Sequence, residues 1–209
     1  MARRSDHSRD ELYDIALEAA ANIVEKDGFR ALTARNVAEA IGYSPGTLYN
    51  LFANLDDMIV HLNGRTLERL DDALRTVEYG GDIEADVFAI LDVYLKFLKQ
   101  HPALWNLLFA HRLPAGVRLP DWYHRKIDDV ISVLEVVLTP LFEAGQERQL
   151  KQAARVLWAG VHGVISLVYT TRMQTFGDAN LTELTENLVS HYLHGLIADL
   201  AAGGADSRQ

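Results

Sequence analysis

The chain of 209 residues contains no cysteine. Disulfide frameworks and thiolate zinc sites are therefore excluded, and a reducing compartment is the expected environment. The sequence also lacks a sustained alternation of polar and apolar residues, so β-strands are not expected. Its longest apolar run, from Val156 to Tyr169, is shorter than the roughly 20 residues that span a bilayer. We therefore expect no membrane-spanning segment.

Basic residues are in the minority, with 20 lysines and arginines against 29 aspartates and glutamates and a formal net charge of -9 at pH 7. This balance argues against a protein that coats nucleic acid by bulk attraction, so any contact with DNA must be local. The first residues include Arg3 and Arg4 but no apolar stretch. We therefore expect no secretory signal, and we expect a cytoplasmic location.

Apolar residues recur at intervals of three and four along nearly the whole chain, which predicts an all-α fold. Ser8 and Glu11 have the spacing of a capping box at the start of the first helix, which should end at Gly28. Pro140 should kink or divide the helix in which it falls. The face that the first helix buries is expected to hold Leu12, Ile15, Ala16, Ala19 and Ile23. Later helices are expected at 54–77, 83–100, 103–111, 121–144, 147–175 and 181–202.

Between the first and fourth helices, two short helices have the spacing of a helix-turn-helix. Ala38, Gly42 and Leu48 supply a small residue at the helix crossing, a glycine in the turn and an apolar anchor in the second helix. The outer face of that helix then presents Gly46 and Asn50. A glycine in a first turn costs stability. Its missing side chain would let backbone amides approach a phosphate or base edge, whereas a plain turn into a small structural helix is the alternative.

The segment from Leu12 to Ile59, with TARNVAEAIGYSPGTLYNLFANLDDMI at its centre, resembles the DNA-binding domain of the TetR family of bacterial transcriptional regulators. HPALWNLLF at 101–109 and LWAGVHGVISL at 157–167 resemble the subgroup whose ligand-binding domain is named for Trp, His and Gly. The resemblance implies a homodimer that binds double-stranded DNA at an inverted-repeat operator. It assigns DNA contacts to Thr33, Arg35, Ser44, Gly46, Thr47, Tyr49, Asn50 and Asn54.

Within this set, Asn50 is the candidate for base readout, because an amide can pair bidentately with adenine. A solvated surface amide is the alternative. Arg3 and Arg4 could reach DNA as a flexible arm or form a disordered end. The family usually has a lysine that contacts a backbone phosphate at the start of the fourth helix, where this chain has Leu55 followed by two aspartates. Asn54 and the free amides of that helix N-terminus could replace the contact.

The expected division places a helix-turn-helix DNA-binding domain at 1–55 and a helical ligand-binding and dimerisation domain at 56–203, with the fourth helix linking them. The helix at 147–175 is apolar nearly all round in its central part, so it must be buried on every side. The resemblance implies that it and the last helix pair with their copies in a second chain; a purely internal core is the alternative. The residues expected at this interface are Val161, Val164, Ile165, Val168, Leu188, Tyr192 and Leu196.

Aromatic and basic residues gather between Tyr94 and His124, which is the composition of an apolar pocket with a few polar groups. We expect most of these aromatic residues in the core and fewer than half in contact with a ligand. A histidine inside an apolar helix is more often a core group, and only the subgroup resemblance makes a ligand role equally plausible for His162. The candidates for ligand binding are Tyr94, Phe97, Trp105, Phe109, Trp122, His124 and His162.

Patterns typical of catalysis are missing. The sequence has no Gly-rich phosphate loop after a strand, no His-Glu-x-x-His and no nucleophile constellation, so an enzyme is not expected. His191 and His194 have a spacing that allows them to share a metal, but no third ligand follows at suitable spacing. We therefore expect neither a metal nor another cofactor.

The favoured function is that of a dimeric repressor that a small, largely apolar effector releases from a palindromic operator. One alternative is a TetR-like activator or an effector-independent DNA-binding dimer. Another, of a different class, is a helical small-molecule-binding protein or enzyme without DNA function. Local basic residues on a net acidic chain, and the missing lysine, leave these alternatives open.

Overall fold

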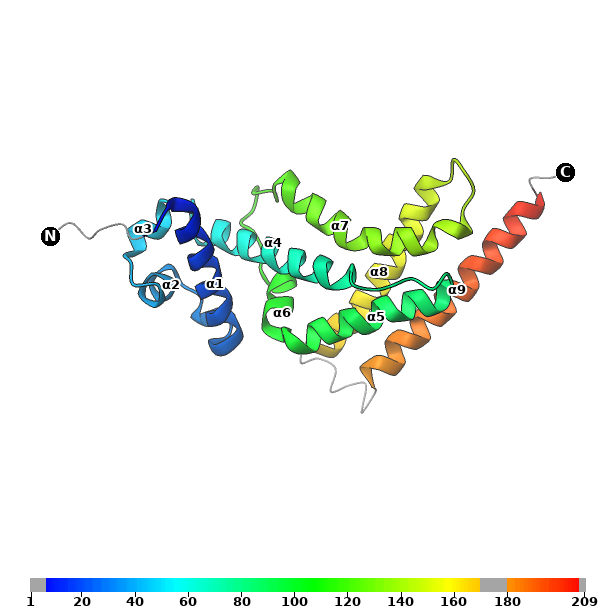
Figure 1. Ribbon diagram of the computed structural model, residues 1–209, viewed down its shortest axis with the longest axis horizontal. Coiled ribbons are helices and arrows are strands. Elements are labelled where there is room, and N and C mark those ends of the chain that lie inside the picture. Colours follow the sequence, from blue (N-terminus) through cyan, green and yellow to red (C-terminus); the bar gives the residue numbers. More distant parts are fainter. Residues whose placement is uncertain (1–6, 170–179, 207–209) are drawn as a thin grey trace. The chain divides into compact units, whose positions relative to one another are not determined.

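The computed structural model describes residues 7–169 and 180–206, and every regular element in those ranges is helical (Figure 1). The α-helices are α1 (Arg9–Asp27), α2 (Ala34–Ala40), α3 (Pro45–Tyr49), α4 (Leu55–Leu74), α5 (Ile83–Gln100), α6 (Pro102–Ala110), α7 (Asp121–Leu138), α8 (Glu147–Tyr169) and α9 (Leu181–Asp206). Single 3-10 turns, η1 (Phe29–Ala31) and η2 (Thr139–Leu141), follow α1 and α7. The all-α prediction is confirmed. Arg3, Arg4 and the residues after 169 in the predicted helix at 147–175 lie outside the described ranges.

Local side-chain chemistry sets the limits of the first helices. The predicted capping box is present, because Ser8 Oγ accepts from the Glu11 amide at 3.2 Å and the Glu11 carboxylate accepts from the Ser8 amide at 2.7 Å. At its other end α1 stops at Gly28, whose φ of 81° is a left-handed conformation that favours glycine. Pro140 lies in η2, so the proline divides the helix predicted at 121–144.

The buried face of α1 differs from the predicted one. Ile15, Ala19 and Ile23, which we expected on the buried face, are half-buried. The buried residues are Leu12, Ala16, Leu17, Ala20, Ala21 and Val24. The buried face is rotated about the helix axis towards Leu17 and Ala21, which leaves Ile15, Ala19 and Ile23 along one flank.

The contacts of the chain divide it into two compact units. The first comprises residues 1–69 and 98–126, and the second comprises 70–97 and 127–209. The hydrophobic core of the first unit joins α1, α2, α3 and α4 with α6, whose Leu104 and Leu107 are buried among them. The first unit therefore contains α6. The predicted boundary at residue 55 instead separates the residues expected to bind DNA from those expected to bind a ligand and form the dimer. That predicted boundary stays a prediction.

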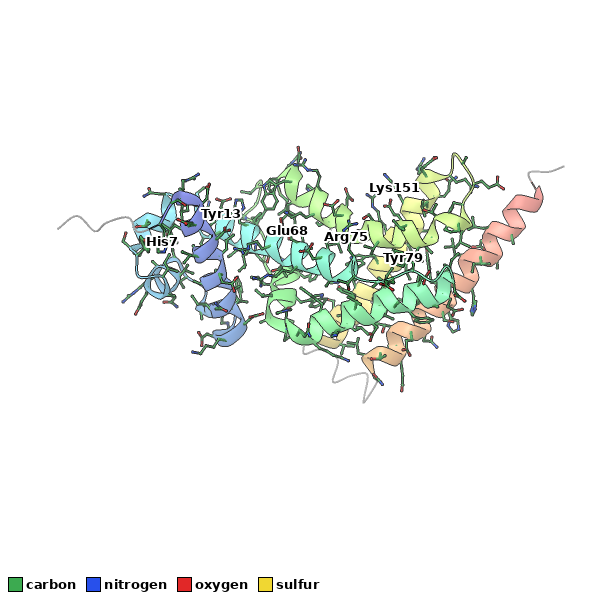
Figure 2. All side chains as sticks on the ribbon, in the orientation of Figure 1. His7, Tyr13, Glu68, Arg75, Tyr79 and Lys151 are labelled. Atoms are coloured by element: carbon green, nitrogen blue, oxygen red, sulfur yellow. The ribbon has the colours of Figure 1, made fainter. Side chains whose placement is uncertain are left out.

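In the second unit, α8 packs on α9. A side-chain carbon added at Gly160 of α8 would lie 3.0 Å from Leu188 of α9, so glycine permits this close approach. Tyr192 of α9 donates its hydroxyl to the carbonyl of Ala153 at 2.9 Å. Arg75, labelled in Figure 2, follows α4 and donates to Ser132 of α7 at 3.4 Å. None of the helices in the described ranges has the length and apolar composition that a bilayer crossing requires.

Candidate DNA-binding surface and ligand pockets

The predicted helix-turn-helix is formed by α2 and α3. Val37 and Ala38 of α2 pack in the core with Leu48 of α3 and with Phe52, which follows α3, and all four side chains are at most 2% exposed. Gly42 lies in the turn with φ of 74°, in the left-handed region. Because these residues bury one side of the pair, the opposite side is presented outward.

Two of the predicted DNA contacts also cap the helices that carry them. Thr33 Oγ1 accepts from the Asn36 amide at 3.1 Å at the start of α2, and Ser44 Oγ accepts from the Thr47 amide at 3.3 Å at the start of α3. In both cases the hydroxyl oxygen acts as an acceptor, which leaves its hydrogen to donate elsewhere. Ser44 Oγ also lies 3.0 Å from Thr47 Oγ1, so one hydroxyl of this pair donates to the other.

Gly46 is a glycine that the protein's own packing does not require. A side-chain carbon added there would meet only Ser44 Oγ, at an ordinary 3.6 Å, and its φ lies outside the left-handed region. Tyr49 at the end of α3 is 54% exposed, and Arg35 and Asn50 are also exposed. The outward surface is therefore polar, with an open position at its centre.

Two contacts on this surface escaped the sequence analysis. His7 Nδ1 lies 2.9 Å from the hydroxyl of Tyr43, and Arg9 donates to the carbonyl of Asn50 at 3.5 Å. They attach the start of α1 to the turn before α3 and to the residue after it. Separations of 36 and 41 residues left no periodic signal from which these pairs could have been found.

At the start of α4, where the family's usual lysine is missing, the side chains cap the helix. Asn54 Oδ1 accepts from the Asp57 amide at 2.8 Å, and the Asp57 carboxylate accepts from the Ala53 amide at 2.8 Å. Asp56 bonds to His111 Nε2 at 2.8 Å. Both carboxylates are thus occupied by partners within the chain, while the side-chain amide nitrogen of Asn54 remains a donor.

The ligand-binding candidates of the second unit lie in its core. Tyr94 is 2% and Phe97 5% exposed, and the Tyr94 hydroxyl lies 3.4 Å from His162 Nδ1. Burial lowers the pKa of His162, which favours the neutral imidazole. Trp158, which the prediction omitted, packs with its ring centre 4.8 Å from that of Tyr94. The apolar cavity beside Tyr94 holds only about 20 Å³, which is room for one water molecule.

The remaining candidates, Trp105, Phe109, Trp122 and His124, belong to the first unit. Trp105 is 1% exposed, with its ring centre 5.0 Å from that of the half-exposed Phe109. Trp122 and His124 are close in sequence but line two different hollows.

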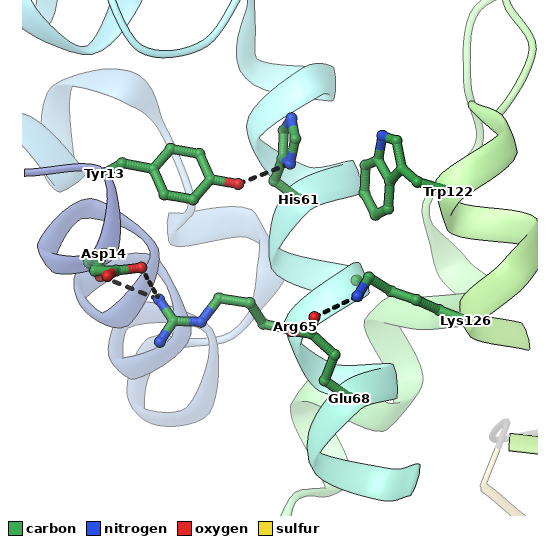
Figure 3. A pocket seen from close by; sticks show the side chains of 8 residues that line it. Tyr13, Asp14, His61, Arg65, Glu68, Trp122 and Lys126 are labelled. Carbon is green, nitrogen blue, oxygen red and sulfur yellow. Dashed lines mark hydrogen bonds and ion pairs between the residues drawn. The ribbon is translucent and has the colours of Figure 1, made fainter. Parts of the chain in front are cut away.

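Trp122 lines an open groove of about 590 Å³ formed by α1, α4 and α7 (Figure 3). Its ring stacks on that of His61, with the two ring centres 5.0 Å apart, and His61 Nδ1 lies 2.7 Å from the Tyr13 hydroxyl. The two cations of the groove have partners, since Arg65 pairs with Asp14 at 3.5 Å and Lys126 pairs with Glu68. Figure 3 thus shows three helices joined side by side by aromatic and ionic contacts.

A second hollow, of about 640 Å³, lies between α4, the end of α6 and the start of α7. His124 lines it, as do Arg112 and Arg118 of the α6–α7 loop. Two buried polar side chains, Asn63 and Tyr123, also face it. Burial raises the pKa of Tyr123 to about 12, against an opposing hydrogen bond from Asn63, so its hydroxyl keeps its proton at neutral pH.

The predicted dimer residues differ in accessibility within the single chain. Val161 and Ile165 are 6% and 0% exposed, so their side chains already belong to the core of the second unit. Half-buried positions are Val164, Val168, Leu188, Tyr192 and Leu196. On the outer side of α8, Val156 and Leu167 are 49% and 52% exposed, and on α9 Ile197 is 43% exposed.

The described residues contain no group of three or more side chains able to hold a metal ion. His191 Nδ1 lies 2.8 Å from the carbonyl of Asn187, and His194 Nε2 lies 3.8 Å from Glu84. This histidine pair is thus engaged by other groups of the chain.

Comparison with known proteins matches both parts of the chain. The family model described as "Bacterial regulatory proteins, tetR family" matches residues 16–62, and the one described as "Tetracyclin repressor-like, C-terminal domain" matches 87–192. The uncharacterized HTH-type transcriptional regulator Rv0681 of Mycobacterium tuberculosis is 22% identical over 91% of this chain and 84% of its own. The subgroup named for Trp, His and Gly is not confirmed.

Solved structures of similar fold include two regulators named FadR. FadR of Thermus thermophilus, a TetR-family transcriptional repressor in complex with lauroyl-CoA, has a TM-score of 0.65 and 17% identity, with 88% of this chain and 94% of that one covered. The fatty acid degradation regulator FadR of Bacillus halodurans has a TM-score of 0.63 and 20% identity over 88% of this chain and 98% of its own. At such identities the likeness establishes the fold alone.

Proposed function

This chain belongs to the TetR family of bacterial transcriptional regulators, and from that premise we propose that it is a dimeric repressor released from an inverted-repeat operator by a small effector. Members of this family are DNA-binding transcription factors rather than enzymes. The observation that carries the proposal is Gly46, because neither its backbone conformation nor its packing against the described residues explains a glycine there. A DNA surface against α3 does explain it, since backbone amides can then approach phosphates closely.

The polar side chains around Gly46 have distinct proposed roles. Thr33 and Ser44 donate the hydroxyl hydrogens left by their capping bonds to backbone phosphates. Arg35 and Tyr49 also contact the backbone, and Asn50 reads an adenine through its exposed amide. These contacts are local, which is how a chain with a net charge of -9 can bind DNA.

The start of α4 contributes through Asn54 in place of a lysine. Its Oδ1 is held by the Asp57 amide, which directs the side chain and leaves Nδ2 to donate to a phosphate. A neutral amide releases no counterion when it binds a phosphate, whereas a lysine does. We therefore expect a weaker salt dependence than the usual lysine would give.

Dimerisation is proposed through the outer faces of α8 and α9, with a second copy packing on the exposed Val156, Leu167 and Ile197 and the half-buried residues beside them. A two-fold dimer places two recognition helices in symmetric positions, which suits an inverted repeat. The cytoplasm is the proposed location, because that is where the operator lies.

The effector is proposed to be small and largely apolar, anchored by a few polar groups. The fold similarity to a FadR bound to lauroyl-CoA supports an acyl-type compound. Release from DNA requires that the effector favour the dimer that does not bind. Changing a 99:1 preference into 1:99 takes roughly 5.5 kcal/mol of differential binding, so tight binding alone is insufficient.

DNA binding by Asn50→Ala, compared with Tyr49→Phe, tests the proposed surface. On the DNA upstream of the protein's own gene, Asn50→Ala should cost about 1–3 kcal/mol per half-site and relax sequence preference. Tyr49→Phe removes a phosphate contact, so it should weaken binding to operator and random DNA alike. Equal losses on both DNAs for Asn50→Ala would show that Asn50 does not read bases.

A further inference from the structure

The hollow between α4, the end of α6 and the α6–α7 loop contains a buried polar atom without a partner. Asn63 of α4 is 3% exposed, and its Oδ1 accepts no hydrogen bond from any described residue. Its amide group makes a long contact of 3.5 Å with the carbonyl of Leu107 and a hydrogen bond with Tyr123, neither of which satisfies Oδ1. A buried acceptor without a donor costs free energy, so an outside donor that reaches it would bind favourably.

The same hollow contains unpaired positive charge. Arg112 and Arg118 line it, and neither forms an ion pair with a carboxylate of the described residues. Two other arginines of the first unit, Arg65 and Arg69, do form ion pairs, with Asp14 and Glu18. Asp121 is the one carboxylate in the lining, so positive charge prevails there.

Apolar side chains complete the walls. Val60 of α4, Leu108 of α6 and Leu113 of the loop line the hollow, whose volume of about 640 Å³ lies in the range of small-molecule sites. Beside Asn63, the protonated hydroxyl of Tyr123 adds a donor. The site thus offers an apolar wall, a buried acceptor and two cations.

We propose that this hollow is the effector site and that it takes a small organic acid with an apolar body and a hydroxyl or N–H group near its anion. The anion binds Arg112 and Arg118, the hydroxyl or N–H donates to Asn63 Oδ1, and the apolar body packs on Val60 and Leu108. This assignment rests on the proposed function and specifies the small, largely apolar effector as an amphipathic acid.

A bond within the first unit connects the site to the DNA-binding surface. His111, whose side chain is 7% exposed, lines the hollow and bonds to Asp56 at the start of α4 at 2.8 Å. Asn54, the proposed phosphate contact, caps that same helix. An acid in the hollow competes with Asp56 for His111 and thereby disturbs the start of α4.

Isothermal titration calorimetry of the full chain with 3-hydroxydecanoate, decanoate and decan-1-ol tests the proposal. We expect 3-hydroxydecanoate to bind best. The double change Arg112→Gln and Arg118→Gln should weaken both acids by about tenfold or more and leave decan-1-ol unaffected, because only the acids lose charge-assisted hydrogen bonds. Asn63→Leu should abolish the preference for the hydroxylated acid over decanoate. Arg125→Gln, an exposed neighbour outside the lining, serves as the control.

The assignment would be overturned if the double arginine change left the binding of the acids unaltered. It would also be overturned if Arg125→Gln weakened their binding equally. So would the absence of binding of both acids at millimolar concentration. Operator binding by the unliganded wild type, measured separately, tests the proposed function. If the protein did not bind the operator, the calorimetric result on the hollow would still stand, so the two claims can fail independently.

Discussion

Two helical glycines of the first unit have opposite surroundings. Gly46 of α3 has open space where a side chain would be, whereas a side-chain carbon at Gly64 of α4 would lie 2.6 Å from Cζ3 of Trp122. Gly64 is therefore needed for Trp122 to pack on α4 (Figure 3). Both are glycines within helices, so the sequence alone does not distinguish their roles. Their surroundings assign Gly64 to packing and leave Gly46 available for DNA binding.

Replacing each glycine with alanine separates these roles. Gly46→Ala should stabilise the fold by up to about 1 kcal/mol, since alanine is the better helix former, and should weaken operator binding. Gly64→Ala should destabilise it by about 1–3 kcal/mol, because the indole must move. Thermal unfolding and DNA titration of both variants measure this. A Gly46→Ala protein that binds operator as tightly as the wild type would remove the proposed reason for this glycine.

Residues that act through local spacing were predictable from the sequence. The predicted cap at Ser8 needs only a partner three positions ahead, and Thr33 and Ser44 cap their helices with the same spacing. Asn63 was not predictable, because a buried acceptor without a partner arises only when distant segments pack around it. The pairing of His111 with Asp56, 55 residues apart, has the same origin.

At the scale of helices, α1, α4 and α7 meet through a stack in which His61 packs flat on Trp122 and Tyr13 meets the His61 ring edge-on. Tyr13 of α1 packs on Phe52, which follows α3, with ring centres 5.1 Å apart. Its hydroxyl donates to His61 Nδ1 when the imidazole carries its proton on Nε2, and His61 stacks on Trp122. The stack therefore joins the start of α7 to the helix-turn-helix through contacts within the first unit.

His61 makes this stack sensitive to pH. Burial lowers the pKa of His61 below its ordinary 6.5, and the nearby charge of Asp57 opposes the shift only in part. Below about pH 6.5 the unfolded chain therefore binds more protons at this position than the folded one, and stability falls as the pH is lowered towards the folded pKa. The wild type should lose more stability between pH 7.5 and 5.5 than His61→Gln does.

Urea unfolding of both proteins across that pH range provides the measurement, and NMR titration of the His61 ring provides an independent value. A ring that titrates above 6.5, or identical pH dependence of the two proteins, would contradict the lowered pKa.

The helices themselves were largely predictable from periodicity. Their stacking was not, because Tyr13 and His61 are 48 residues apart and no local pattern relates them.

For the whole molecule, the proposed dimer makes a separable prediction. Leu167 on the outer side of α8 is 52% exposed, so Leu167→Glu should leave the fold intact but place a charge without a partner in the dimer interface. We expect sedimentation to show a monomer and DNA affinity to fall. Val136→Glu on α7, at a residue 58% exposed, is the matched control and should remain dimeric. A Leu167→Glu protein that stays dimeric would place the interface elsewhere.

The central claim is that this acidic chain binds DNA through a local polar surface, and the salt dependence of operator binding tests it most directly. Titrating the wild-type protein onto the DNA upstream of its own gene at several salt concentrations gives the slope of log affinity against log salt. Arg35 is the one basic residue among the proposed contacts, so two protomers neutralise about two phosphates, which predicts a slope of magnitude roughly 2. A slope near zero at every candidate operator would contradict DNA binding by this surface.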